Sequence, residues 1–457
     1  MSLKYDICII GAGSAGLTMA AVSASLGHKV ALVESHKMGG DCLNYGCVPS
    51  KALLHCAKAG ITDFQQVNKH IKHAIASIAP HDSVERFKDL GCDVYQEKGI
   101  FKNATTLQVG SKRIKAKRFV IATGASTFIP PIQGLENVPF LTNETIFNLK
   151  TCPSTLTIIG GGAIGVEMAF AFRKLGAQVT MIESAPCILA QSDKDAVQII
   201  RQELLNMGVK IHENVVIEKI MQEGVEIAVR LEEKTISSTH LLIATGRKAN
   251  LENLNLKAAN IHYNAKGIHV DKTLRTNQKH IYAIGDCASK LQFTHVASFE
   301  ASVVIKRVLF GLMHSKVKYN AVPRVLYTSP ELAETGISQQ QAIQTYGEDN
   351  IKTVMVPYAD VHRAVCDDKT LGFAKIILKN NGTVLGACIV GEQAGELITA
   401  WTTLITYKRK ISDLSGVTVP YPTYSEINKQ AASLFYKNSF YSSKVQKLSK
   451  WLFKYLG

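Results

Sequence analysis

Apolar residues in the first half of the chain follow one pattern twice. Each copy has an apolar strand, a glycine-rich turn, a helix and a second apolar strand that ends at a glutamate. Short runs of consecutive apolar residues bounded by turn signals are typical of a parallel sheet that is buried on both faces. The predicted strands are Tyr5–Ile10, Lys29–Val33, Thr155–Ile159 and Gln178–Ile182, and the two helices reach about Leu26 and Leu175.

A second repeated segment supports the same duplication. Val120–Gly124 and Leu242–Gly246 are near copies, and each is a short apolar strand that stops at a glycine. Each lies where a dinucleotide-binding domain would close. The sequence therefore predicts an α/β architecture with two Rossmann-like dinucleotide-binding domains.

The pattern changes from about Pro323 onwards. Apolar and polar residues alternate along three segments, and Asn381-Gly382 predicts a hairpin turn between the last two. A helical segment follows at Gly395–Tyr407. We predict an antiparallel sheet with helices on one face, which is a C-terminal α+β domain. The alternating segments are Lys352–Pro357, Gly372–Leu378 and Thr383–Val390.

The two glycine-rich turns carry the first candidate chemistry. In a Gly-x-Gly-x-x-Gly turn, the first glycine turns tightly, the second lets the backbone approach a pyrophosphate, and the third lets helix and strand pack closely. The helix N-terminus offers N–H groups to that anion. The glutamate lies 18 residues beyond the third glycine in both copies, where it could accept hydrogen bonds from ribose hydroxyls. Glycine-rich turns in an ordinary α/β sheet are the alternative. The residues are Gly11, Gly13, Gly16 and Glu34 in the first copy and Gly160, Gly162, Gly165 and Glu183 in the second.

Composition and charge exclude several classes of protein. Apolar residues make up 46% of the chain and charged residues 19%, as in ordinary globular proteins. The net charge of +15 suggests nucleic acid, but the sequence has no zinc-finger spacing and no RNA-binding aromatic signature, so we expect no nucleic-acid partner. Residues 7–27 carry no charge, as in a signal peptide, yet their four glycines and the strand that follows argue against one.

Two of the ten cysteines stand apart from the rest. Cys42 and Cys47 lie in the segment GGDCLNYGCVPSK, where a helix is expected to begin near one of them. A helix N-terminus and the nearby Lys51 would lower a thiol pKa and supply the reactive thiolate. A metal site or two structural thiols are the alternatives, but the spacing is poor for zinc and we predict no bound metal. The other eight cysteines are dispersed, which favours a reducing cytoplasm over a secreted disulfide framework.

With these motifs in place, the chain resembles the flavoprotein pyridine nucleotide–disulfide oxidoreductases, in the branch of lipoamide dehydrogenases and mercuric reductases. The resemblance covers about residues 4–435 and rests on GAGSAG, GGDCLNYGCVPSK, GGGAIGVE, both Ala-Thr-Gly segments, TSPE at 328–331 and YPTYSE at 421–426. It implies a homodimer. It also implies an FAD-binding domain at 1–148 and 262–320, an NAD(P)-binding domain at 149–261 and a dimerisation domain at 321–435.

The resemblance also implies roles for single residues. Cys47 would face the flavin, and Cys42 would be the outer thiol that exchanges with the acceptor. Lys51 would lie near the flavin and pair with Glu167, although a solvated surface lysine is the alternative. The residues implied to hold FAD are Gly11, Gly13, Gly16, Glu34, Gly40, Lys51, Gly124, Asp286 and Thr294.

The second dinucleotide site suggests which nicotinamide cofactor binds. A carboxylate at Glu183 would repel a 2′-phosphate and accept a hydrogen bond from a 2′-hydroxyl, so we predict NADH as the preferred cofactor over NADPH. The residues implied to bind it are Gly160, Gly162, Gly165, Glu183 and Gly246.

The chain departs from the family near residue 421. Lipoamide and glutathione enzymes have a His-Pro-Thr segment whose histidine and a following glutamate form an acid–base pair. Here Tyr421 replaces the histidine and Glu426 remains. A phenol is a poor base at neutral pH, which argues against efficient turnover of lipoamide or glutathione. Mercuric reductases are similar in having tyrosine there. They also carry a terminal cysteine pair, whereas this chain has no cysteine after Cys388.

We therefore predict an FAD-dependent enzyme that passes electrons from NAD(P)H to a disulfide of Cys42 and Cys47. The final acceptor would be a disulfide, a metal ion or a quinone, as in a dihydrolipoyl dehydrogenase-like or mercuric reductase-like enzyme. The alternative is a flavin-bound redox sensor, or a membrane-attached binding protein, without efficient turnover.

Residues 436–457 form a separate basic segment. Apolar residues recur there at helical spacing, and Lys444, Lys447, Lys450 and Lys454 occupy the other positions. Such a helix could contact an anionic membrane surface from the cytoplasm, or dock on its own domain.

Overall fold

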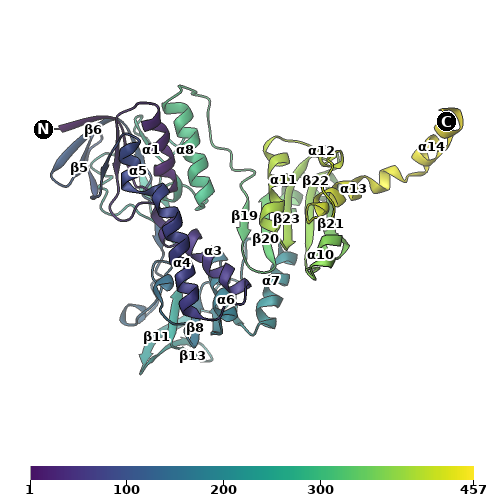
Figure 1. The fold of residues 1–457 in the computed structure, drawn as a ribbon, viewed down its shortest axis with the longest axis horizontal. Helices are drawn as coiled ribbons and strands as arrows, with labels where there is room; N and C mark the ends of the chain where they lie inside the picture. Colours follow the sequence, from purple (N-terminus) through teal and green to yellow (C-terminus); the bar gives the residue numbers. More distant parts are fainter. Residues whose placement is uncertain (1, 457) are drawn as a thin grey trace. The chain divides into compact units, whose positions relative to one another are not determined.

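The computed structural model describes residues 2–456, except for the side chains of Asn438 and Ser439. The chain divides into two compact units (Figure 1). The first comprises Met1–Cys187 and Gly208–Val317, and the second comprises Ile188–Met207 and Lys318–Gly457. Both of the predicted glycine-rich turns lie in the first unit.

A seven-stranded sheet forms one half of the first unit. Its order is β3-β2-β1-β6-β5-β4, and β18 also pairs with β6. Strands β1, β2, β3, β6 and β18 are parallel, whereas β4 and β5 are antiparallel. The strands are β1 Ser2–Ile10, β2 Val30–Val33, β3 Cys92–Tyr95, β4 Gly99–Asn103, β5 Thr106–Val109, β6 Lys112–Ile121 and β18 Ile281–Ala283.

Both faces of this sheet are buried, which explains why its strands are continuous apolar runs. Ile7 and Ile9 of β1 pack in one apolar cluster, and Cys8 and Ile10 pack in another, as the alternation of side chains along a strand requires. Helices α1 (Ser14–Ser25) and α8 (Thr294–Val308) lie side by side on the first face (Figure 1). Segments nearly 300 residues apart in sequence thus build one nucleotide-binding fold.

A second parallel sheet repeats the arrangement. Its order is β10-β9-β8-β14, and helix α6 follows β8 just as α1 follows β1. An antiparallel three-stranded sheet, β11-β12-β13, accompanies it. The duplication predicted from the apolar pattern is therefore present in the fold. The elements are β8 Thr155–Ile159, α6 Ala163–Lys174, β9 Gln178–Ile182, β10 Lys210–His212, β11 Ile217–Glu223, β12 Glu226–Leu231, β13 Thr235–Ser238 and β14 His240–Ile243.

Short elements connect these sheets and carry the candidate chemistry. Helix α3 packs against α4 and α6. Strands β7 and β15, which follow the two Ala-Thr-Gly segments, pair with each other. The elements are α2 Gly40–Asn44, α3 Cys47–Lys58, α4 Phe64–Ile78, α5 Val84–Asp89, β7 Ala125–Thr127 and β15 Arg247–Ala249.

The second unit contains the expected antiparallel sheet, in the order β19-β20-β23-β22-β21. Helices α11 and α13 pack over one face, around the fully buried Trp401. Lys375 of β22 points to the other face and pairs with Asp193, which caps α7. The expectation of helices on one face only is therefore wrong, because α7 comes from a distant segment. The elements are α7 Lys194–Asn206, β19 Arg324–Leu326, β20 Glu331–Gly336, α9 Gln339–Tyr346, β21 Ile351–Pro357, α10 His362–Cys366, β22 Phe373–Lys379, β23 Val384–Gly391, α11 Ala394–Thr406, α12 Ser412–Ser415, α13 Glu426–Phe440 and α14 Ser443–Leu456.

Candidate active site

The first glycine-rich turn has the geometry of a phosphate cradle. A Cβ at Gly11 or Gly16 would collide with the carbonyl oxygen of Ala122 or Gly11, so packing alone requires glycine at both positions. A Cβ at Gly13 would meet only the Cα of Gly40, at 3.9 Å, which leaves the turn open. Helix α1 has no side-chain cap and no acidic residue in its first turn. Its N-terminal N–H groups therefore remain suited to an anion.

The second turn repeats this geometry. A Cβ at Gly160 or Gly165 would collide with a backbone carbonyl, whereas a Cβ at Gly162 would meet nothing within 4 Å. Gly124 and Gly246, which follow the closing strands, have φ values of +68° and +121° with open space around them. Their backbone conformation, rather than packing, favours glycine there.

The two predicted glutamates hold equivalent positions. Glu34 accepts hydrogen bonds from the backbone N–H groups of Ala12, at 2.6 Å, and His36, at 2.7 Å. Glu183 accepts from Gly161, at 2.5 Å, and Ala185, at 2.7 Å. Each carboxylate thus lies beside the second residue of its glycine turn, where a nucleotide ribose would be expected.

The cysteine pair lies next to the first glycine turn. Cys42 is on α2, and Cys47 is the first residue of α3. Both are thiols in this structure, and they are joined by a hydrogen bond. The Cys47 Sγ also lies 3.4 Å from the Oγ1 of Thr294, the first residue of α8. The structure therefore brings together the two thiols and a third residue that the sequence assigned to the same site.

The two thiols differ in their pKa values. The hydrogen bond from Cys42 lowers the pKa of Cys47 to about 6, and the Thr294 hydroxyl and the charge of Lys51 act in the same direction. The hydrogen bond to Cys47, together with burial, raises the pKa of Cys42. Cys47 is thus the thiolate of the pair at neutral pH, and Cys42 is the protonated thiol.

The expected ion pair between Lys51 and Glu167 is present. The Lys51 Nζ lies 2.8 and 3.1 Å from the two carboxylate oxygens of Glu167. The Glu167 side chain is 6% exposed and that of Lys51 is 35% exposed. The pair joins α3, which carries Cys47, to α6 of the second parallel sheet.

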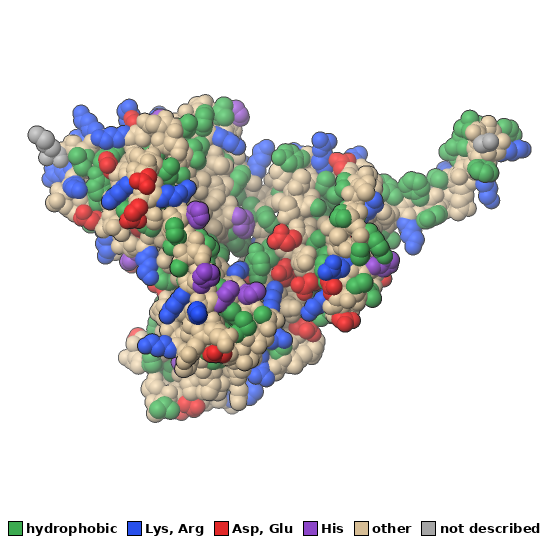
Figure 2. All heavy atoms as spheres, viewed as in Figure 1, with side chains coloured by type: hydrophobic (Ala, Val, Ile, Leu, Met, Phe, Trp, Pro, Cys, Tyr) green, Lys and Arg blue, Asp and Glu red, His purple; other side chains and the backbone are tan. Residues whose placement is uncertain are grey.

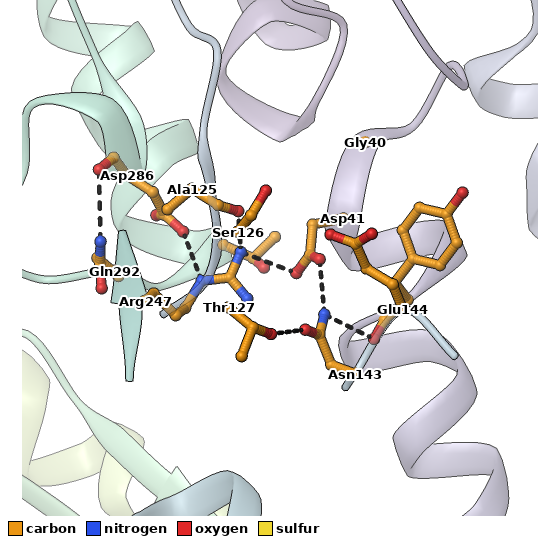
Figure 3. Close-up of polar contacts among 12 residues, drawn as sticks. Gly40, Asp41, Ala125, Ser126, Thr127, Asn143, Glu144, Arg247, Asp286 and Gln292 are labelled. Carbon is orange, nitrogen blue, oxygen red and sulfur yellow. Dashed lines mark hydrogen bonds and ion pairs between the residues drawn. The ribbon is translucent and has the colours of Figure 1, made fainter. Parts of the chain in front are cut away.

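A cluster that the sequence did not reveal lies around Arg247 (Figure 3). The guanidinium of Arg247 is 3.2 Å from the Asp41 carboxylate and 3.6 Å from that of Asp286. Asn143 donates to Asp41 at 2.9 Å and accepts from Thr127 at 2.5 Å. Arg247 immediately follows Gly246 of the second Ala-Thr-Gly segment, which was the one available signal for it.

Asp286 is the most perturbed carboxylate of this cluster. Burial raises its pKa to about 6, against the opposing effect of Arg247 and with the support of the charges on Asp41 and Cys47. The Nε of Arg247 is buried; it lies 3.6 Å from the Asp286 carboxylate and has no partner within hydrogen-bonding distance among the described residues. A buried guanidinium that is short of one hydrogen bond, beside a carboxylate and an open glycine cradle, fits a polyhydroxylated ligand such as the ribityl chain of FAD.

The predicted acceptor-side residues lie in the second unit. Tyr421 is exposed, and its hydroxyl is 3.2 Å from the Nδ1 of His362, the first residue of α10. Glu426 begins α13, and its Oε2 is buried without a hydrogen-bond partner among residues 2–456. No sequence signal pointed to His362, because it is 59 residues from Tyr421 in the chain.

Family comparisons agree with this geometry. A pyridine nucleotide-disulphide oxidoreductase model matches residues 5–301, and the dimerisation domain of the same family matches residues 322–432. The chain is a pyridine nucleotide-disulphide oxidoreductase. It therefore is an FAD-dependent, NAD(P)H-linked disulfide oxidoreductase with a C-terminal dimerisation domain, as the motifs predicted.

Relatives of this oxidoreductase carry different names. It is 34% identical to a mercuric reductase of Bacillus cereus over 95% of this chain and 72% of the relative. It is 31% identical to a dihydrolipoyl dehydrogenase of Chlamydia muridarum over 95% of this chain and 97% of the relative. The structure matches a Cu(II) complex of RclA, an HOCl-induced flavoprotein disulfide reductase from Escherichia coli, with a TM-score of 0.88 and 31% identity over 93% of this chain and 99% of that one. These relatives establish the enzyme class and leave the acceptor open.

The described part of this oxidoreductase, residues 2–456, has no helix with the length and apolarity needed to cross a bilayer.

Proposed function

We propose that this oxidoreductase reduces a thiol-reactive acceptor, either a disulfide or a soft metal ion, through Cys42 and with NADH as the electron source. The observation that carries the proposal is the asymmetry of the thiol pair. Cys47 is the low-pKa thiol beside Thr294 and Lys51, and Cys42 is the protonated partner. A quinone acceptor would not require this pair.

Several residues are suited to hold FAD. The open N-terminus of α1 would take the pyrophosphate, Glu34 the adenosine ribose, and Asp286 with Arg247 the ribityl chain. When bound, FAD supplies an acceptor for hydride and a two-electron donor to a disulfide. Thr294 and the Lys51–Glu167 pair would hold Cys47 at that cofactor.

The proposed reaction is a thiol–disulfide exchange that uses both cysteines. The Cys42 thiolate attacks one sulfur of the acceptor disulfide, which forms a mixed disulfide and releases one thiolate. Cys47 then attacks the Cys42 sulfur, which reforms the Cys42–Cys47 disulfide and releases the second thiolate. Two electrons have passed to the acceptor, and two protons are taken up by the leaving thiolates.

The proton on Cys42 requires an acceptor before this attack. In the proposed homodimer, Tyr421 of one protomer lies at the cysteines of its partner, and its hydroxyl carries that proton towards His362. The hydrogen-bonding distance of 3.2 Å between Tyr421 and His362 supports this relay, and Glu426 would orient the acceptor. His362 would thus be the proton acceptor, which is the role of the histidine of the His-Pro-Thr segment in the lipoamide enzymes.

NADH is the proposed electron source because of Glu183. Its carboxylate lies beside the second glycine-rich turn and would face the 2′-position of the adenosine ribose. A 2′-phosphate there would meet a like charge. We also propose a cytoplasmic location, with peripheral membrane contact through residues 437–457.

An acceptor screen with Cys42→Ser tests the proposal. The native protein should oxidise NADH faster than NADPH when a small disulfide, Hg(II) or Cu(II) is supplied. Cys42→Ser should lose acceptor turnover but keep the bleaching of bound FAD by NADH. Cys366→Ser, which removes the other exposed thiol, is the matched control and should behave as native. Acceptor turnover that survives in Cys42→Ser would show that electrons leave without the cysteine pair.

A further inference from the structure

Helix α14 presents an apolar surface that the described chain does not cover. All of its residues, Ser443–Leu456, are exposed, and none is buried. Trp451 is 57% exposed and Leu456 is 80% exposed. Phe440 and Tyr441, just before the helix, are 68% and 70% exposed. Isolated exposed apolar residues are normal on a protein surface, but a continuous strip of this kind indicates an interaction site.

The helix separates its apolar and basic residues. At 100° per residue, six apolar residues fall within an arc of about 140°, and three lysines fall within about 60° on the opposite side. We call these sets the apolar face and the basic face. The apolar face is Val445, Leu448, Trp451, Leu452, Tyr455 and Leu456, and the basic face is Lys447, Lys450 and Lys454.

Among the apolar and basic residues of α14, two lie outside this division. Lys444 falls within the apolar arc, next to Trp451 and Tyr455, where its long stem can lie along an apolar surface while its charge stays in water. Phe453 falls between the two faces and is 83% exposed. Both positions are compatible with a helix that lies flat at the boundary between an apolar and an aqueous phase.

We infer that α14 binds the surface of an anionic lipid bilayer, with its apolar face in the acyl boundary and its basic face at the headgroups. Charge complementarity favours an anionic bilayer as the binding partner, because residues 437–457 contain five lysines and no acid. Each lysine near an anionic bilayer contributes about 1 kcal/mol, or about fivefold in partitioning. The rings of Trp451 and Tyr455 lie side by side at a tilt, with 5.4 Å between their centroids, and both are residue types that prefer the membrane interface.

A second copy of the chain is a poorer occupant. The whole chain carries a net charge of +15, so a second copy offers no overall charge complementarity to the basic face. The surface seen in Figure 2 shows apolar and basic side chains over α14 without acidic ones. The inference concerns the proposed peripheral contact and does not depend on the redox chemistry.

Vesicle binding by the FAD-loaded full chain tests the inference. The native protein should sediment with vesicles of phosphatidylcholine and phosphatidylglycerol and remain in solution with phosphatidylcholine alone. Trp451 supplies a second readout, because the other tryptophan, Trp401, is 0% exposed. Tryptophan emission should shift to shorter wavelength on addition of anionic vesicles, and Trp451→Phe should abolish the shift.

Two sets of variants test the basic face and the apolar face independently. Changing the three lysines of the basic face to glutamine should lower partitioning about a hundredfold. Leu448→Ser with Leu452→Ser should also release the protein from vesicles. The matched control changes three exposed lysines elsewhere, Lys69, Lys72 and Lys88, to glutamine and should bind as native.

Three results would overturn the inference: no sedimentation of the native chain, equal binding to both kinds of vesicle, or equal losses in the basic-face and control variants. NADH oxidation should be unchanged in every α14 variant. If the native protein does not oxidise NADH at all, the proposed function is contradicted and the membrane inference is unaffected.

Discussion

Replacement of Cys42 by alanine should make Cys47 a weaker acid. In the structure, the hydrogen bond from Cys42 is the largest influence that lowers the pKa of Cys47 to about 6. Cys42→Ala removes that donor and leaves Thr294 and Lys51 in place. Cys42→Ser keeps a hydroxyl donor at the same position, so the two variants differ chiefly in this one hydrogen bond.

The expected magnitude follows from the value of a charged hydrogen bond. Such a bond contributes about 1.5–3 kcal/mol, and because Cys47 is exposed we take only the lower end, which is about one pKa unit. The thiolate fraction of Cys47 at pH 7 would then fall from about nine tenths to about one half. At pH 6 it would fall from about one half to about one tenth, so alkylation there should slow about fivefold.

Alkylation of the reduced protein by iodoacetamide, followed by mass spectrometry of the Cys47 peptide across pH 5–9, measures this directly. Since the pKa is lowered in the native protein, reactivity should be lost as pH falls through about 6. In Cys42→Ala the same loss should occur at higher pH, whereas Cys42→Ser should lie closer to native. Cys366, the other exposed thiol, is an internal reference for the reagent. Identical midpoints in the alanine and serine variants would refute the role given to Cys42.

Further predictions concern the other groups of the site. Burial raises the pKa of Asp286 from 3.8 to about 6, so its ionisation lowers stability progressively as pH rises from about 4 to about 6, and the loss is complete above that range. Asp286→Asn should therefore stabilise the FAD-free protein by up to about 3 kcal/mol above pH 7 and not near pH 4, as measured by urea unfolding. Glu183→Ser should raise kcat/KM for NADPH relative to NADH about tenfold or more, and an unchanged ratio would remove the basis of the NADH proposal. His362→Phe should slow acceptor reduction about tenfold or more without slowing FAD reduction by NADH, and His362→Gln, which can still accept from Tyr421, should recover part of the rate.

Local patterns were sufficient to predict most of the fold. The strands Thr155–Ile159 and Gln178–Ile182 were predicted with their observed bounds, because a strand buried on both faces reads as an uninterrupted apolar run between turn residues. The glycines at 11 and 160 were equally readable, since each has a positive φ and lies against a carbonyl that excludes any Cβ. The position of α7 was not predictable from pattern, because its contact with β22 depends on the ion pair between Asp193 and Lys375.

The site was predictable only where residues lie close in sequence or match a motif. Cys42, Cys47 and Lys51 satisfy both conditions, whereas Arg247 and His362 satisfy neither. Each of the latter two acts through a partner at least 39 residues away, since Asp286 is the nearest partner of Arg247 in sequence. A side chain whose partners come from distant segments leaves no periodic signal, so tertiary structure was needed to identify both.

The role of Asp41 follows from the charges around Arg247. One guanidinium faces two carboxylates, Asp41 and Asp286, so both cannot be neutralised by it. Asp286 is therefore harder to ionise, since the charge on Asp41 adds to the effect of burial in raising its pKa to about 6. The charge on Cys47 raises the same pKa further. Because such coupling is reciprocal, formation of the Cys47 thiolate on reduction should draw a proton to Asp286, and Asp41→Thr should weaken that uptake by lowering the pKa of Asp286.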